Sequence, residues 1–137
     1  MRIACLPVTS MQENVYFYYD SNTKAGIVID PGGEPDRLCR FIADNELRIE
    51  GILLTHGHFD HILAVGAVKE ATSAPVACHA DESVMLSSME QNFSSIVRRN
   101  TELKADILFN DGDVFEFEGH KIKVLHTPGH TRGGVSY

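Results

Sequence analysis

The sequence predicts a single domain, residues 1–137, with a mixed fold of the α/β (α+β) class. Three observations lead to this prediction. The chain begins with short β-branched and aromatic segments separated by turns, its middle alternates apolar strands with helical segments, and its later part contains a hairpin pattern. With 137 residues, of which 43% are hydrophobic and 23% charged, the chain is long enough to bury one core.

The first segments are expected to form an antiparallel meander of three strands. Each segment is rich in β-branched or aromatic side chains, and the turn sequence Asp-Ser-Asn-Thr at residues 20–23 separates the second from the third. The predicted strands are residues 3–6, 15–19 and 26–29. The sequence Asp-Pro-Gly-Gly at residues 30–33 then ends the third strand, because proline and glycine favour turns.

A helix is expected next, followed by alternating strands and helices. Leu38, Phe41 and Ile42 recur at helical spacing, so that one helical face can cover the sheet. The apolar run at residues 51–54 is too short for a helix and is interpreted as a buried strand. The predicted helices are residues 35–46 and 61–71, a short strand covers residues 76–78, and residues 81–99 are expected to be mostly helical, with Met85, Met89 and Phe93 as a core-facing stripe.

The clearest local geometry is a β-hairpin over residues 114–125. Gly119 and His120 are interpreted as its two-residue turn, which places charged side chains on one face and apolar side chains on the other. The predicted pairs are Glu118–Lys121, Glu116–Lys123, Phe117–Ile122 and Phe115–Val124. This register makes His120 an exposed turn residue and not a metal ligand, while His126 is interpreted as a packed or capping imidazole.

Charge and composition exclude several classes of partner. The formal net charge of −7 leaves no basic stripe for a phosphate backbone, so nucleic acid is not expected as a partner. No segment has the length and apolarity of a signal peptide or a membrane span, so we expect a cytoplasmic protein without membrane association. Cys5, Cys39 and Cys78 are odd in number and far apart, which is typical of reduced thiols. Cys78 and His79 are interpreted as the end of a buried strand, with metal ligation as the less favoured alternative.

The sequence Thr-His-Gly-His-Phe-Asp-His at residues 55–61 is the main candidate for a functional site. It directly follows the predicted buried strand, so a rigid element holds the start of this loop in position. His56 and His58 are two residues apart, so their rings lean the same way, and the glycine between them allows a tight approach. Asp60 and His61 follow where a helix is expected, so their side chains can point in a different direction from those of His56 and His58. One loop could therefore supply ligands to two metal ions.

A second histidine motif lies near the end of the chain. Isolated histidines on surface loops usually have no such role, but four ligand-type side chains within residues 56–61 favour a metal site. The sequence Thr-Pro-Gly-His-Thr at residues 127–131 repeats the same arrangement, in which an apolar strand and a turn of small residues precede a histidine, His130. A Pro-Gly-His turn is a weak signal by itself.

Both histidine motifs resemble those of a known family. The pattern His-x-His-x-Asp-His is typical of the metallo-β-lactamase superfamily, and Thr-His-Gly-His-Phe-Asp-His is similar to its glyoxalase II (hydroxyacylglutathione hydrolase-like) branch. The resemblance implies an αββα sandwich in which His56, His58 and His130 share one metal, and Asp60 and His61 ligate a second. Three neutral imidazoles that leave a position open for water are typical of catalytic zinc, although iron and manganese accept the same ligands.

The resemblance implies a metal-dependent hydrolase whose substrate is a small-molecule thioester, such as an S-acyl glutathione. The metal would lower the pKa of its bound water to about 7 and polarise the scissile carbonyl. Asp60 would orient the resulting hydroxide or take its proton, besides ligating the second metal. Asp30 has two interpretations: it satisfies turn amides, or it orients a ligand histidine.

The chain departs from the family pattern at its C-terminus. Family members continue with further strands and with the remaining ligands of the second metal, so the C-terminal part is expected to be missing and the second site incomplete. Pairing of two copies across the exposed edge, as a homodimer, is one expectation, and a longer parent protein is the other. The alternative functions are a mononuclear iron persulfide dioxygenase of the same superfamily and a metal-binding fragment without turnover. A tRNA-processing nuclease shares the loop motif but is disfavoured by the acidic charge balance.

Overall fold

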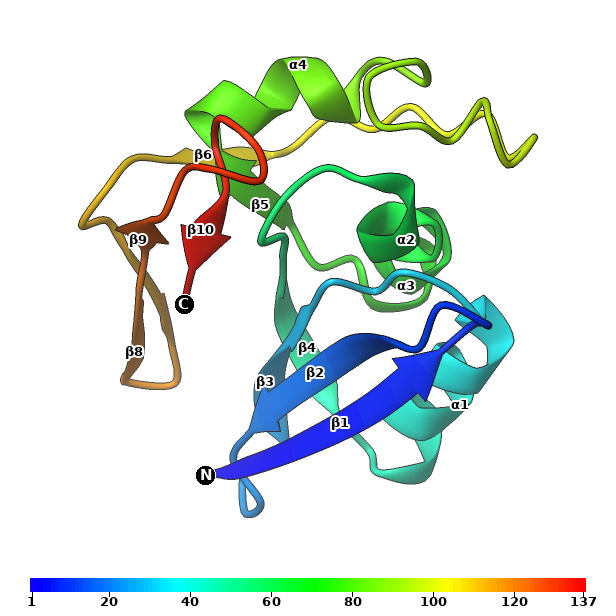
Figure 1. The fold of residues 1–137 in the computed structure, drawn as a ribbon. Coiled ribbons are helices and arrows are strands. Elements are labelled where there is room, and N and C mark those ends of the chain that lie inside the picture. The colour runs from blue at the N-terminus through cyan, green and yellow to red at the C-terminus, as the bar shows by residue number, and fades with distance from the viewer.

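A computed structural model describes all 137 residues and shows the mixed α/β fold that the sequence predicts (Figure 1). The strands are β1 (Arg2–Val8), β2 (Glu13–Tyr19), β3 (Ala25–Ile29), β4 (Arg48–Leu53), β5 (Val76–His79), β6 (Ile107–Phe109), β7 (Val114–Phe117), β8 (His120–Lys123), β9 (Leu125–His126) and β10 (Val135–Ser136). The helices are α1 (Pro35–Asp44), α2 (Phe59–Ile62), α3 (Val65–Thr72), the 3₁₀ turn η1 (Ala80–Glu82) and α4 (Ser83–Leu86). None of these helices is long and apolar enough to cross a membrane.

The main sheet has six strands in the order β1-β2-β3-β4-β5-β6. The first three strands pair antiparallel, as the predicted meander requires, whereas β3 to β6 pair parallel. Parallel neighbours need crossover connections: α1 connects β3 to β4, α2 and α3 connect β4 to β5, and η1, α4 and the loop after them connect β5 to β6. The parallel arrangement brings the carboxyl ends of β3, β4 and β5 to the same edge of the sheet. Loops from that edge carry the candidate site.

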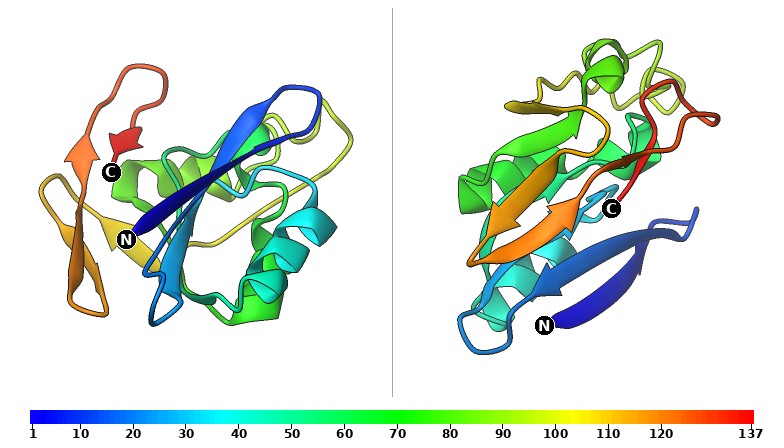
Figure 2. Two further views of the ribbon diagram at one scale, coloured as in Figure 1. Left: turned by 90° about the horizontal axis from the view of Figure 1, so that it is seen from below. Right: turned by 90° about the vertical axis from the view of Figure 1, so that its left-hand side faces the viewer.

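The two faces of the sheet bury separate clusters of apolar side chains. Helices α1 and α3 cover one face, where Phe17 contacts Phe41 of α1 at a ring-centroid distance of 4.7 Å. The β7–β8 hairpin covers the other face, where Tyr18 meets Phe117 edge to face at 6.2 Å (Figure 2). A Cβ on Gly51 of β4 would lie 2.5 Å from the ring of Phe115, so only glycine permits this close packing. A helix layer, a sheet and a β-hairpin layer therefore follow one another.

The hairpin has a different register from the predicted one. Its turn consists of Glu118 and Gly119, both with positive φ (47° and 77°), which is the backbone of a type I′ turn. His120 consequently enters β8 and pairs with Phe117, and each β8 residue faces a partner two positions earlier than predicted. The charged face and the apolar face of the hairpin are still as predicted, because a shift of two residues keeps each side chain on the same side. His120 is not a turn residue; its Nε2 lies 3.5 Å from Asp20 Oδ2.

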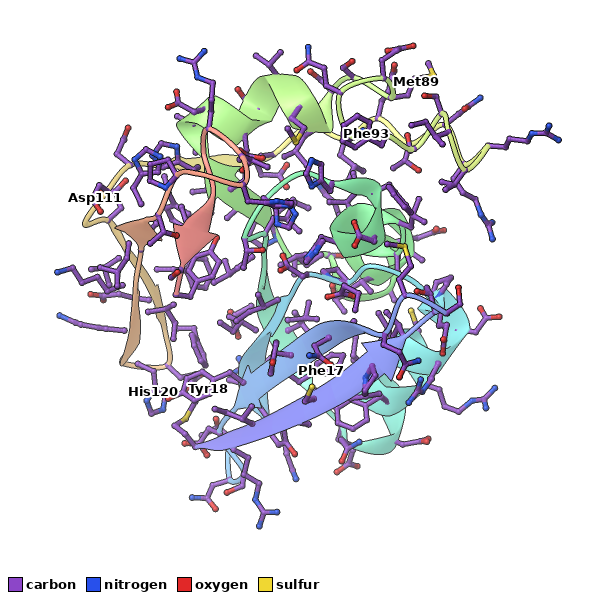
Figure 3. The ribbon with its side chains drawn as sticks, viewed as in Figure 1. Phe17, Tyr18, Met89, Phe93, Asp111 and His120 are labelled. Carbon is purple, nitrogen blue, oxygen red and sulfur yellow. The ribbon has the colours of Figure 1, made fainter.

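The predicted helix over residues 81–99 is mostly wrong. Only η1 and α4 are helical, and residues 87–104 form an irregular loop. Figure 3 places Met89 and Phe93 in this loop, far from the core around Phe17. The buried side chains of the loop are polar: Asn92 donates to Thr101 O at 2.8 Å, and Ser94 also bonds the backbone of Thr101. Such side-chain to backbone bonds compete with helix formation. The predicted core-facing stripe is therefore absent.

An apolar cavity of about 400 Å³ lies between the antiparallel strands, the hairpin and the C-terminal residue. Its lining includes Ile3, Tyr18, Ile122 and Tyr137, and Ile3 is 69% exposed. Val135, beside the edge that was expected to be exposed, is only 6% exposed and pairs with His126 of β9. Pairing with a second copy stays a prediction, which light scattering would test.

Candidate metal centre

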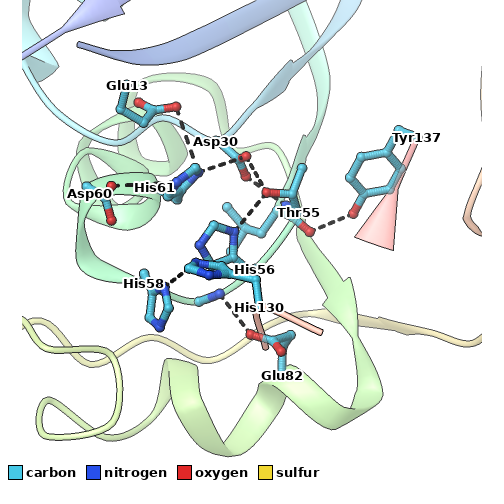
Figure 4. A network of polar contacts seen from close by, with 12 residues as sticks. Glu13, Asp30, Thr55, His56, His58, Asp60, His61, Glu82, His130 and Tyr137 are labelled. Carbon is cyan, nitrogen blue, oxygen red and sulfur yellow. Dashed lines mark hydrogen bonds and ion pairs between the residues drawn. The ribbon is translucent and has the colours of Figure 1, made fainter. Parts of the chain in front are cut away.

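The candidate site consists of loops at the carboxyl ends of β3, β4 and β5, joined by a loop from the far end of the chain (Figure 4). Strand β4 ends at Leu53, and residues 54–58 run across this edge into α2. The distant loop between β9 and β10 carries His130, and the backbone bond from Val135 N to Thr55 O, 3.0 Å, attaches it to the end of β4. Ligands tend to bind at this edge of parallel sheets.

Three histidines converge at the centre of the site. His56, His58 and His130 each offer one ring nitrogen, and these nitrogens all lie within 4.8 Å of one another. His58 Nδ1 and His130 Nε2 are 3.0 Å apart, and the His56 ring stands nearly perpendicular to both other rings. His56 Nε2 is buried and has no hydrogen-bond partner in the protein. The structure thus brings together the three residues that the resemblance assigned to one metal.

The protonation states of His56 and His58 suit metal binding. Burial, together with the nearby His61, His58 and His130, lowers the pKa of His56 from 6.5 to about 3. Burial and the neighbouring His130 also lower the pKa of His58. A neutral imidazole has a free lone pair, which a metal ion requires. The buried atom His56 Nε2 and the chemistry of the three donors therefore fit a cation such as Zn²⁺, Fe²⁺ or Mn²⁺.

Asp30 fixes the orientation of two of the candidate ligands. Its Oδ1 accepts the backbone N–H of Thr55 at 2.7 Å, and its Oδ2 accepts the Thr55 hydroxyl at 2.5 Å. Thr55 Oγ1 is in turn 3.1 Å from His56 Nδ1, and Asp30 Oδ2 is 3.0 Å from His61 Nδ1. These contacts leave the Nε2 atoms of both histidines for a metal. Of the two interpretations of Asp30, the geometry favours the orienting one.

Asp60 and His61 form a second potential ligand pair beside the first cluster. Asp60 Oδ2 lies 3.7 Å from His61 Nε2, and the rings of His56 and His61 are only 4.0 Å apart. A Cβ on Gly32 would fall 1.5 Å from Asp60 O, so this glycine lets the loop after β3 pack against α2. The pair offers two ligand-type side chains, against three in the histidine cluster. His61 is also one of a second group of three, with Glu13 and Asp30, whose ligand-type atoms lie within 4.8 Å of one another.

Glu13 is a buried carboxylate of this site that the sequence analysis missed. Its side chain is 4% exposed, its Oε1 is 3.8 Å from His61 Nδ1, and its Oε2 has no hydrogen-bond partner. Burial raises the pKa of Glu13 to about 8. Burial alone would lower the pKa of His61, but the hydrogen bond to Asp30 and the charges of Asp30, Asp60 and Glu13 outweigh it and raise that pKa. No sequence motif marks Glu13, since only the sheet brings β2 beside α2.

A separate group of His79, Asp81 and His126 is less suited to a metal. The two rings are stacked 4.1 Å apart with an angle of 11°, so their lone pairs run parallel rather than converging. His79 Nδ1 accepts the N–H of Asp81, and His126 Nε2 contacts Arg132 O at 2.8 Å. His126 is thus packed and bonded to the backbone, as expected. Burial raises the pKa of the adjacent Cys78 thiol to about 12, so it stays protonated.

Three histidines that can hold a metal lie at the carboxyl edge of parallel strands, where ligands commonly bind, and this is an arrangement typical of a catalytic metal centre. The chain belongs to the metallo-β-lactamase superfamily, whose sequence profile matches residues 8–137. The resemblance inferred from the histidine motifs is thereby confirmed, and with it the predicted fold.

Comparison with individual proteins gives the same family. The chain is 31% identical to the hydroxyacylglutathione hydrolase GloC of Haemophilus influenzae over 140 residues, which cover 100% of the chain and 66% of GloC. The crystal structure of the B3 metallo-β-lactamase BLEG-1 superposes with a TM-score of 0.91 at 35% identity, covering 99% of this chain and 66% of that one. The crystal structure of TTHA1623 in a di-iron-bound form has a TM-score of 0.75 at 29% identity. The match covers 96% of this chain and 64% of TTHA1623. The chain spans about two thirds of the length of its curated relatives.

Proposed function

We propose that this chain carries the metal centre of a hydrolase that acts on thioesters, with S-acyl glutathiones as the substrate class. The observation that carries the proposal is the convergence of His56, His58 and His130 beside the Asp60–His61 pair. The similarity to GloC supports glutathione thioesters, because that relative is named as a hydroxyacylglutathione hydrolase. Zinc is the proposed metal, since three imidazoles with one open position suit it.

A metal held by these residues would supply a hydroxide at neutral pH and polarise the carbonyl of the thioester. The residues of the chain have separate roles in this chemistry. His56, His58 and His130 hold the ion, and Asp30 keeps His56 and His61 in their ligating orientation through the contacts described above. Asp60 faces the site with its side chain 20% exposed, so its carboxylate can accept the proton of the attacking water.

Phe93 is the proposed contact for the acyl group. Its ring stacks on His58, with ring centroids 5.2 Å apart and an angle of 29°, yet the residue is 44% exposed. The backbone next to Phe93 is tied to the start of α2, because Phe59 N donates to Asn92 O at 2.8 Å. Phe93 adopts a φ of 65°, an uncommon backbone conformation for an aromatic residue. An exposed apolar ring beside a metal ligand suits the apolar part of a substrate.

The function is tested by assaying thiol release from an S-acyl glutathione with protein loaded with zinc, iron or manganese. We expect release that requires the metal and saturates with substrate. Stoichiometric metal binding without thiol release would instead select the metal-binding fragment without turnover. Oxygen uptake with a glutathione persulfide, only in the iron-loaded protein, would select the dioxygenase alternative.

Replacing Phe93 with alanine is expected to raise KM for thioesters with apolar acyl groups. Losing part of the apolar contact of one aromatic ring costs about 1 kcal/mol, which is roughly a fivefold change in KM. Ile96→Ala in the same loop is the matched control, because Ile96 is another apolar residue of this loop and is 75% exposed. Equal KM values for the Phe93 and Ile96 variants across a series of acyl lengths would contradict the assignment.

A further inference from the structure

Glu82 is a carboxylate that lies almost completely inside the protein, at the end of the 3₁₀ turn after β5. The residue is 1% exposed. Its Oε2 accepts the backbone N–H of Gly57 at 2.9 Å, and its Oε1 accepts the backbone N–H of Gly133 at 2.7 Å. No lysine, arginine or histidine lies within ion-pair distance of this carboxylate. Both of its oxygens are therefore bound only by the protein backbone.

The two glycines belong to the two loops that carry the candidate metal ligands. Gly57 lies between His56 and His58, and Gly133 follows His130 by three residues. The loops are distant in sequence, since Gly57 is 25 residues and Gly133 is 51 residues from Glu82. One side chain thus binds the backbone of both ligand loops at once.

The surroundings of Glu82 leave no room for a side chain at position 133 and are tight at position 57. A Cβ on Gly133 would lie 2.7 Å from the backbone nitrogen of Glu82, a distance that real Cβ atoms essentially never show. A Cβ on Gly57 would lie 3.1 Å from Met85 Cγ and 3.3 Å from Glu82 Oε2. The close approach that these glycines allow is what brings their N–H groups within reach of the carboxylate.

We propose that Glu82 is a positioning residue that sets the separation of the two ligand loops and thereby the metal affinity of the histidine cluster. His58 and His130 come from different loops, so the 3.0 Å between their ring nitrogens depends on how those loops are held. The two hydrogen bonds to a carboxylate are charge-assisted and stronger than neutral ones. The inference rests on the proposed metal site, but it does not depend on thioester hydrolysis.

The test measures metal affinity in Glu82→Gln by competition with a chromophoric chelator, using zinc and cobalt. Glutamine keeps the shape but turns one acceptor oxygen into an NH₂ group that faces an N–H donor. Changes in groups that orient metal ligands typically weaken affinity by about 10–100-fold, and we expect at least tenfold here. Glu82→Asp, which keeps both oxygens but shortens the reach, is the second variant if Glu82→Gln does not fold. Unchanged affinity in a folded variant would overturn the proposal.

A thermodynamic cycle separates positioning from a general loss of stability. In a His130→Ala background His130 no longer ligates the ion, so the effect of Glu82→Gln on affinity should shrink well below tenfold. An equal loss in both backgrounds would show that Glu82 only supports the fold. Asp20→Ala is the matched control, because Asp20 also accepts two backbone N–H groups, from Asn22 and Thr23, in a turn away from the site. It should lower the free energy of unfolding and leave metal affinity unchanged.

Discussion

Replacing His56 with alanine is expected to remove most of the metal that the protein binds, whereas His120→Ala should leave the metal content unchanged. His56 supplies a buried, neutral nitrogen at the centre of the cluster. Removing a direct ligand should cost more than the roughly 10–100-fold in affinity that follows from changing an outer contact. His120 lies in β8 near Asp20, so its loss removes a histidine without touching the cluster.

The measurement is elemental analysis of both variants after expression with the same metal supply and dialysis against metal-free buffer. The variants have the same substitution and differ only in where the histidine lies. A similar metal content in the two would contradict the assignment of His56. Circular dichroism checks that each variant is folded.

Asp60→Asn is expected to lower kcat for thioester hydrolysis by roughly 10²–10⁴-fold, the usual contribution of a positioned proton acceptor. Asparagine keeps the size of the side chain but cannot accept a proton at neutral pH. Metal bound by His56, His58 and His130 should remain, because Asp60 is outside that cluster. The effect should therefore separate catalysis from metal binding.

The control for this variant is Asp36→Asn, which changes an exposed carboxylate in α1 outside the site. Thiol release is measured at saturating substrate, with the metal content of each variant determined in parallel. A kcat for Asp60→Asn within a few fold of the unchanged protein would refute the role of Asp60 in proton transfer. A loss of metal in proportion to the loss of activity would reassign Asp60 to metal retention.

Local patterns predicted the elements whose side chains repeat regularly. The three-strand meander follows from β-branched and aromatic runs, and the ligand loop follows from the short apolar strand that precedes it. The hairpin register was predicted wrongly because Glu118 takes a positive φ, which is uncommon for a residue other than glycine, asparagine or aspartate. The irregular loop after α4 was taken for a helix because the backbone bonds of Asn92 and Ser94 do not show in side-chain spacing.

The histidines of the site could be predicted because their spacing within one loop is itself a signal. The carboxylates around these histidines could not be predicted in this way. Glu13 comes from β2 and Glu82 from η1, and each meets the site only through the folded sheet. The two interpretations of Asp30 could not be separated from the sequence, because its contacts to Thr55 and His61 form only in the folded chain. Groups that act through the backbone or through another side chain have no fixed sequence spacing to detect.

The same three-histidine cluster has a consequence for the folding of the chain. An ion shared by His58 and His130 joins positions 72 residues apart, so it closes a long loop as a disulfide would. For covalent links, loops of about 15 to 100 residues contribute about 3–5 kcal/mol by restricting the unfolded chain. The C-terminal strands form only two-stranded ladders, whereas β1 to β6 form one continuous sheet. The ion would therefore stabilise the C-terminal strands against local unfolding. We expect metal binding to slow amide exchange in these strands far more than in the main sheet.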